Sequence, residues 1–214
     1  MITLIQQGGI VGIVMWMILA AGIMALVVFL ERLFHVHRAQ IKSDDFVRGI
    51  CNIVGRRNIK EALSICDETP GPVARIVRAA IQHRGQDRRL IVQAVDDAAV
   101  TEIARMERRF GVLATVAQLA PLLGLLGTVL GMIQTAMEIE QKTPLIQAGD
   151  LAGGIWLALI TTAAGLCVAI LSYAGYNLLV TKVDGIVLDM ERSAGEILGF
   201  FTSSALFSSD ASSH

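Results

Sequence analysis

Three apolar segments without a charged side chain constrain this chain more than any other feature. They cover residues 10–30, 110–137 and 151–181 and contain 21, 28 and 31 residues. A helix needs roughly 20 apolar residues to cross a bilayer, so each segment is long enough to span one. Only 17% of the 214 residues are charged, against about 25% in soluble domains. We therefore expect an all-α membrane protein with three transmembrane helices.

The first segment has one alternative interpretation, a cleaved signal peptide. The nine residues before it carry no positive charge, and Glu31 and Arg32 follow it directly, as in a stop-transfer flank. We therefore expect residues 10–30 to remain as a membrane helix.

The distribution of basic residues predicts the orientation. Of the 18 Lys and Arg residues, 15 lie between Glu31 and Gly111. Basic residues near membrane ends stay on the cytoplasmic side. Residues 31–109 are thus expected to form a cytoplasmic domain, with residues 1–9 and the loop 138–150 in the periplasm. The C-terminus is then cytoplasmic.

The cytoplasmic region has helical patterns and few breaks. Pro70-Gly71-Pro72 is the strongest break, and Pro72 suits the first turn of a following helix. After Asp87 no breaker occurs before Pro121. The pattern predicts one helix from about Asp87 to about Glu138, roughly 75 Å long at 1.5 Å per residue.

The third apolar segment also continues beyond the membrane. Residues 182–201 alternate apolar and charged positions with the 3.6-residue period of an amphipathic helix. The Ser-rich residues 202–214 have no such period, and we expect them to be disordered. The fold class is thus three transmembrane helices with long helical cytoplasmic extensions.

Small and polar side chains form stripes in the second and third segments. Glycines at helical spacing let membrane helices approach closely, so we expect four of them to pack helices: Gly124, Gly127, Gly131 and Gly165. The candidates for an ion path are Gln118, Thr128, Thr135, Thr161 and Thr162. The alternative for any single threonine is a hydrogen bond to its own helix backbone.

None of the three segments contains Asp, Glu, Lys, Arg or His. Buried ionisable groups are the usual mark of proton and ion pathways. A titrating group must therefore come from a partner subunit. An intramembrane serine protease would need a membrane Ser and a His, but the four His residues lie outside the segments. We expect no enzyme, no metal site and no cofactor, and the net charge of −1 gives no reason to expect nucleic-acid binding.

Two motifs carry a family resemblance. The run Ala120-Pro-Leu-Leu-Gly-Leu-Leu-Gly-Thr-Val-Leu-Gly-Met-Ile133 resembles the second-helix motif of the ExbB/TolQ/MotA ion-channel family. The run Gly154-Ile-Trp-Leu-Ala-Leu-Ile-Thr-Thr-Ala-Ala-Gly-Leu166 resembles its third-helix motif, and Tyr176-Asn177 matches the end of that helix. The residues of these motifs are most similar to those of the ExbB/TolQ branch.

The resemblance implies a pentamer in the bacterial inner membrane whose second and third helices line a central pore. It implies an ExbD/TolR-like single-span partner with a membrane Asp, and a TonB- or TolA-like protein that receives the work of the proton motive force. Thr128 and Thr162 match the family's pore-facing threonines. The chain departs from the family at Leu157, where many members have Glu, and at Leu171, where many have Pro.

Two functions from different classes follow from these observations. The first is the pore-forming subunit of an ion-driven motor. The second is an oligomeric membrane scaffold or sensor that conducts no ions, an alternative that the Leu at position 157 keeps open.

Overall fold

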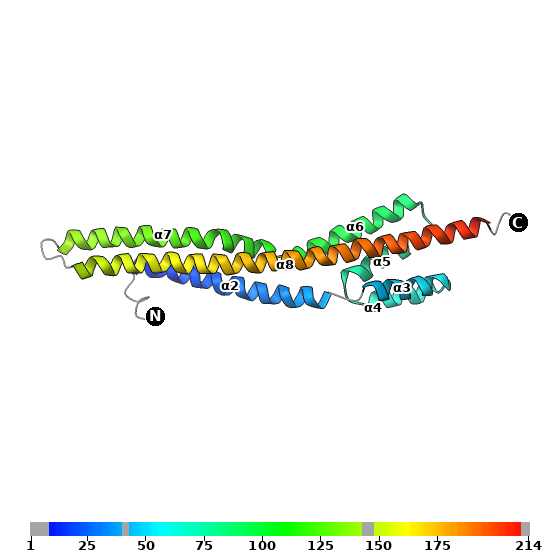
Figure 1. Cartoon of the computed structure of the whole chain (residues 1–214), viewed down its shortest axis with the longest axis horizontal. Helices are drawn as coiled ribbons and strands as arrows, with labels where there is room; N and C mark the ends of the chain where they lie inside the picture. Colours follow the sequence, from blue (N-terminus) through cyan, green and yellow to red (C-terminus); the bar gives the residue numbers. More distant parts are fainter. Residues whose placement is uncertain (1–8, 40–42, 143–147, 211–214) are drawn as a thin grey trace. The chain divides into compact units, whose positions relative to one another are not determined.

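The computed structural model describes residues 9–39, 43–142 and 148–210, and these are almost entirely helical (Figure 1). No β-strand occurs in these ranges, and the all-α class is confirmed. The helices, in chain order, are α2 (Gly9–Ala39), α3 (Ser43–Gly55), α4 (Ile59–Glu68), α5 (Pro72–Gln82), α6 (Arg88–Glu107), α7 (Phe110–Lys142) and α8 (Ala148–Asp210).

Three of these helices are long and apolar enough to cross a membrane. Their apolar stretches are Val11–Val36 in α2, Phe110–Gln141 in α7, and a part of Ala152–Thr202 in α8. Most large apolar side chains in these stretches are exposed on the single chain, Trp16, Leu122 and Leu171 among them. An exposed apolar surface of this extent fits a lipid or protein environment rather than water.

The chain divides into two compact units. The first unit contains α2 as far as Arg32, α7, and α8 as far as Leu178. The second contains the end of α2 from Leu33, helices α3 to α6, and α8 from Leu179.

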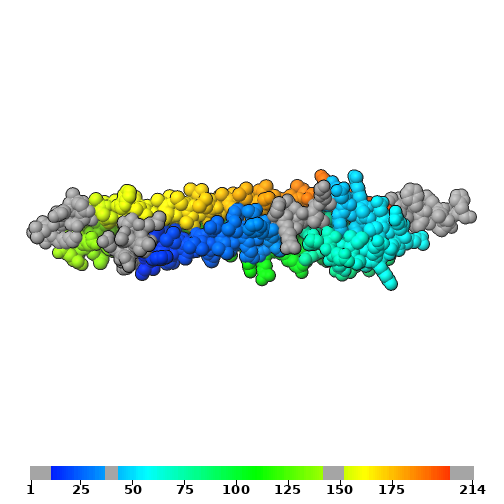
Figure 2. Space-filling model, turned by 90° about the horizontal axis from the view of Figure 1, so that it is seen from below, coloured from blue at the N-terminus to red at the C-terminus, as the bar shows by residue number. Residues whose placement is uncertain are grey.

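In the first unit, small side chains form the common core of the three helices. Ala25 of α2, Val116 and Ala120 of α7, and Ala169 of α8 form one buried cluster. Buried positions recur every three or four residues along each helix, as expected for one contact face per helix. Figure 2 shows α2 (blue) lying lengthwise along α8 (yellow).

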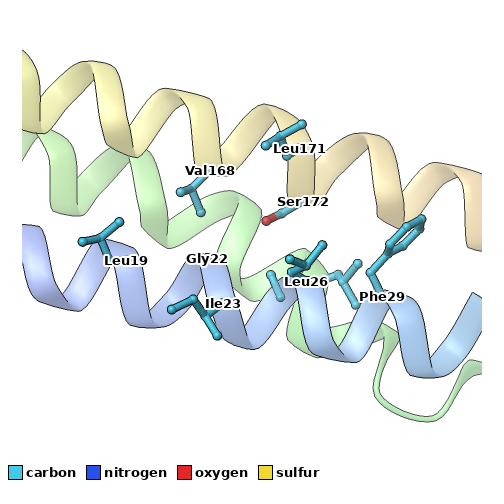
Figure 3. Close-up of a pocket in the computed structure, with 10 residues that line it drawn as sticks. Leu19, Gly22, Ile23, Leu26, Phe29, Val168, Leu171 and Ser172 are labelled. Carbon is cyan, nitrogen blue, oxygen red and sulfur yellow. The ribbon is translucent and has the colours of Figure 1, made fainter.

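Helices α2 and α8 leave an apolar groove of about 290 Å³ between them, and Leu113 of α7 contributes to its lining. Gly22 lies at a close approach of the two helices, because a Cβ built there would be 3.1 Å from Cγ2 of Val168. Figure 3 shows aliphatic and aromatic side chains such as Phe29 around the groove, with the Ser172 hydroxyl as the oxygen among the labelled side chains.

The prediction of one helix from Asp87 to Glu138 is wrong, because α6 ends at Glu107 and α7 begins at Phe110. Arg109, between them, has a left-handed backbone with φ +77°. Its carbonyl accepts a hydrogen bond from the Val112 N–H at 3.1 Å, and this bond forms part of the first turn of α7. Neither residue between the two helices, Arg108 or Arg109, is Gly or Pro, and Gly111 lies inside the first turn of α7.

Contacts in the first unit explain why the break is tolerated. A left-handed non-glycine residue costs about 1–2 kcal/mol. Arg109 Nη1 donates to both carboxylate oxygens of Glu31 at 2.5 and 2.7 Å, and an exposed pair of this kind contributes about 0.2–1 kcal/mol. The buried Phe110 ring also packs edge-on against Tyr176 at a centroid distance of 6.4 Å, worth about 0.5–1.5 kcal/mol. Together these contacts offset the backbone strain.

The second unit is built around α5, which packs on α4 and α6, while α3 packs on α4. Nearly every apolar side chain of α5 is buried, including Ile76, Val77 and Ile81. Pro72 occupies the first turn of α5, and Asp87 precedes α6, as the sequence indicated. The late part of α8 contributes Ile186, Met190 and Ile197 to the buried residues of this unit.

Helix α8 continues to Asp210, whereas the sequence predicted disorder from residue 202. The prediction is therefore wrong for residues 202–210, and residues 211–214 lie outside the described residues. Residues 200–210 contain no Pro or Gly, and extending an existing helix is much easier than starting one.

Burial of Cys66 on α4 generates a prediction about thiol chemistry in the second unit. Burial raises the pKa of the Cys66 thiol from 9.0 to about 11, and the neighbouring Asp67 adds to the increase. Because the folded pKa is the higher one, this group favours the folded state below about pH 9, and the contribution is lost as the pH rises towards 11.

We expect Cys66 to be alkylated about a hundredfold more slowly at pH 8 in the folded protein than in urea, since the thiolate is the reactive form. A variant with Cys51→Ser and Cys167→Ser isolates this thiol, and mass spectrometry after iodoacetamide treatment measures the rate. The folded rate should keep rising to about pH 11. A rate that stops rising near pH 9 would contradict the raised pKa.

Candidate functional site: the α7–α8 helix pair

Four buried glycines bring the backbones of α7 and α8 into direct contact in the first unit. A Cβ built at Gly165 would lie 2.5 Å from the Ala120 carbonyl oxygen, and one at Gly124 would lie 3.0 Å from Cα of Thr162. At Gly131 it would lie 2.9 Å from Cβ of Ala158, and at Gly127 it would meet the Thr161 side chain. The helical spacing of glycines in the sequence predicts the same four as packing positions. Only glycine leaves the space that the opposite helix occupies.

A hydrogen bond between side chain and backbone joins the two helices at the centre of this contact. The Thr162 hydroxyl of α8 donates to the Gly124 carbonyl of α7 at 2.9 Å. Thr162 is half-buried, and Gly124 is buried. The bond therefore fixes the register of the two helices, because a slip of one residue would move the hydroxyl away from this carbonyl.

Two of the predicted ion-path threonines lie inside the helix pair. Thr161 is fully buried and donates to the Ala158 carbonyl at 2.7 Å. Thr135 is buried and donates to the Gly131 carbonyl at 2.8 Å. Both hydroxyls therefore bond to their own helices while their side chains fill the space beside glycines, Thr161 beside Gly127 and Thr135 beside Gly154.

The remaining two candidates lie at the surface of the pair. Gln118 is exposed on α7, and Thr128 is half-buried and donates to the Leu125 carbonyl at 2.6 Å. The structure thus separates the five residues into a buried set (Thr135 and Thr161) and an accessible set (Gln118, Thr128 and Thr162). The helical period of the sequence could not distinguish the two sets, because it does not tell which face of each helix meets the other helix.

Leu157 is the position at which the resemblance described above leads to the expectation of a Glu. It is half-buried on α8, next to the buried Ala158. The apolar side chain leaves the pair without a carboxylate at this level, because residues 110–137 and 151–181 contain no Asp or Glu.

The ion pair between Glu31 and Arg109 was not predicted, although its signal was present in the sequence. The two residues flank the ends of the first and second apolar segments, and opposite charges at adjacent helix ends can pair across helices. This pair lies at the boundary of the uncharged region and ties α2 to the start of α7.

The close contact at Gly165 predicts the effect of adding a methyl group. Gly165→Ala should lower the stability by about 1–3 kcal/mol, because the new carbon meets the rigid backbone at Ala120. Gly185→Ala is the matched control on the same helix, since nothing lies within 4 Å of a Cβ there. Alanine favours helix by up to about 1 kcal/mol, so this control should be neutral or stabilising.

Thermal unfolding in detergent, followed by circular dichroism, measures both variants. An unchanged or higher midpoint for Gly165→Ala would show that the helices do not approach as closely as described.

Comparison with known proteins places this helix pair in a family. The model of the MotA/TolQ/ExbB proton channel family matches residues 68–192, which is more than half of the chain. The match begins at the end of α4 and covers α5, α6 and α7 together with most of α8. The family consists of channel and transport proteins and not of enzymes.

Several relatives carry ExbB names. The chain is 35% identical over 173 residues to a biopolymer transport ExbB-like protein of Synechocystis sp., covering 79% of this chain and 68% of that protein. It is 27% identical to an ExbB homologue of Methanothermobacter thermautotrophicus, covering 81% of this chain and 61% of that protein. The chain is 28% identical to the biopolymer transport protein exbB1 of Vibrio cholerae, covering 85% of this chain and 81% of that protein.

The chain therefore spans about three fifths of the methanogen protein's length. From its family match and these relatives, the chain belongs to the MotA/TolQ/ExbB proton channel family, in the ExbB/TolQ branch.

Proposed function

We propose that this chain is the pore-forming subunit of an inner-membrane motor driven by the proton motive force. Such a motor energises a TonB- or TolA-like protein that spans the periplasm, for outer-membrane import or envelope maintenance. The observation that carries the proposal is the α7–α8 pair, which combines a glycine contact, an interhelical Thr162 bond and an uncharged surface within the family match.

The lack of charge in the helix pair argues for a partner. Protons move along titrating groups and water, and a carboxylate in a membrane is the usual titrating group. Since residues 110–137 and 151–181 supply none, the carboxylate comes from an ExbD/TolR-like single-span subunit with a membrane Asp. This chain then provides the polar wall against which that Asp is protonated and released.

We assign the wall to the accessible set of polar residues. Thr128 lies at the surface of the pair, and Gln118 offers an amide elsewhere on α7. The half-buried Thr162 carries its hydroxyl at the edge of the contact, bonded to the Gly124 carbonyl. Thr135 and Thr161 serve the packing of the pair, because their hydroxyls are buried and bonded to their own helices. A homo-pentamer would bring five such walls around one pore.

We also propose the orientation that the basic residues favour. The N-terminus and the 138–150 loop are periplasmic, while residues 31–109 and the C-terminus are cytoplasmic, in a bacterial inner membrane. The membrane spans are then residues 10–30, 110–137 and 151–181.

Thr162→Val tests the proposed wall. Valine keeps the shape of the side chain but removes the hydroxyl, so we expect proton flux to fall at least about tenfold, as for the loss of about 1.4 kcal/mol of stabilisation. Flux is measured with a pH-sensitive dye in proteoliposomes that contain this chain and its single-span partner. Thr162→Ser keeps the hydroxyl and should retain flux.

Thr101→Val is the matched control, since Thr101 is an exposed α6 threonine that bonds only to the Asp97 carbonyl among the described contacts. Full flux in Thr162→Val would contradict the role of Thr162. Complete absence of flux in the unmodified complex would instead favour the scaffold or sensor.

A topology experiment tests the orientation independently of transport. Green fluorescent protein fused to the C-terminus should fluoresce, because it folds in the cytoplasm. Alkaline phosphatase inserted between residues 142 and 148 should be active, because it needs the periplasm to form disulfides. The opposite pattern of the two reporters would reverse the assignment.

A further inference from the structure

A polar cavity of about 450 Å³ lies in the second unit, apart from the α7–α8 pair. The start of α5, the end of α6 and the exposed His35 of α2 surround it. Arg75 and Arg105 are its two cationic lining residues, and both side chains are half-exposed or more. The proposed motor mechanism assigns this cavity no role.

Glu102 holds the two arginines in place. Its side chain is only 10% exposed, and one carboxylate oxygen, Oε1, accepts from Arg75 Nη1 at 2.6 Å and from Arg105 Nη1 at 3.0 Å. A guanidinium has five N–H donors, and this contact uses one nitrogen of each. The remaining N–H donors are therefore already oriented. A ligand that binds them has less entropy to lose in ordering the two long arginine side chains.

The charges in the cavity favour an anion. Two guanidinium groups against one carboxylate leave a net charge of +1 among the Arg and Glu side chains of the lining. The cavity also includes Gly71 and Pro72, at the N-terminus of α5, where the helix dipole is positive. Phosphate groups suit such a site, because arginine forks match their geometry.

The position along the chain places the cavity near the surface of the membrane. His35 is five residues after the end of the proposed span 10–30, and Met106 is four residues before the proposed span 110–137. Four residues span at most about 14 Å. The polar headgroup layer extends about 5–8 Å beyond the hydrocarbon core on each side. Side chains as long as Arg105 thus reach this layer.

We propose that the cavity binds the phosphate group of an anionic membrane lipid such as phosphatidylglycerol. The arginines contact the phosphate oxygens, and Glu102 positions the arginines without contacting the lipid. The carboxylate also limits the affinity, because it repels the anion that its two partners attract.

Binding of phosphatidylglycerol to the purified full chain in neutral detergent tests the proposal. The probe carries a fluorophore on an acyl chain, and phosphatidylcholine with the same fluorophore is the neutral reference. Arg75→Gln and Arg105→Gln should each weaken the preference for phosphatidylglycerol about fivefold, since one basic residue near a membrane contributes about 1 kcal/mol. Arg108→Gln is the matched control: it is exposed on the chain three residues after Arg105 and outside the cavity.

Glu102→Gln should increase lipid binding, whereas a misfolded variant would lose it. The Gln amide oxygen can still accept from the two arginines, while the negative charge that repels the phosphate is removed, so phosphatidylglycerol binding should tighten about threefold or more. Tighter binding in this variant, weaker binding in the two arginine variants and no change in Arg108→Gln would support the site.

Three results would overturn the proposal. Equal losses in Arg105→Gln and Arg108→Gln would indicate general attraction to a basic surface. An unmodified chain with no preference over phosphatidylcholine would exclude the site. Complete displacement of the lipid by millimolar inorganic phosphate would identify a soluble phosphate as the ligand instead.

Discussion

Direct contact between the backbones of α7 and α8 is the constraint on which the first unit depends. Within a bilayer the lipid chains are as apolar as leucine, so burial of apolar area contributes little to helix association. Close packing and polar contacts must hold the helices together. The glycines at positions 124, 127, 131 and 165 allow that approach, and the Thr162 hydroxyl uses it to reach the Gly124 carbonyl.

This contact also determines which polar groups are accessible. Thr161 lies against Gly127 and is fully buried, while its neighbour Thr162 is half-buried and reaches the opposite helix. Two adjacent threonines thus differ in role because successive helical residues point about 100° apart. The proposed motor depends on this difference, because a pore wall needs hydroxyls that a partner's carboxylate can approach.

Charged groups are concentrated outside the apolar segments, where they perform a different task. Glu31 and Arg109 join α2 to the start of α7, and Glu102 joins Arg75 of α5 to Arg105 of α6. Ion pairs at a boundary with water cost less desolvation than pairs in the hydrocarbon core. The chain thereby combines an uncharged membrane region with a connection between helices that depends on charge.

The sequence by itself determined the class of the protein, its three apolar helices and the glycines suited to packing. Length, hydropathy and the 3.6-residue period are local properties of the sequence. In a bilayer a long apolar segment forms a helix, because its backbone polar groups must bond to one another. The motifs around Gly127 and Thr162 also indicated the family, because they keep the spacing that close packing requires.

Only the tertiary structure decided where α6 ends and which hydroxyls are buried. Neither Arg108 nor Arg109 is Gly or Pro, and the left-handed backbone of Arg109 is supported by Glu31 and, through Phe110, by Tyr176, residues distant in the sequence. The separation of Thr161 from Thr162 likewise depends on which face of α8 meets α7. Such outcomes follow from contacts between distant segments, which the pattern of a single helix does not contain.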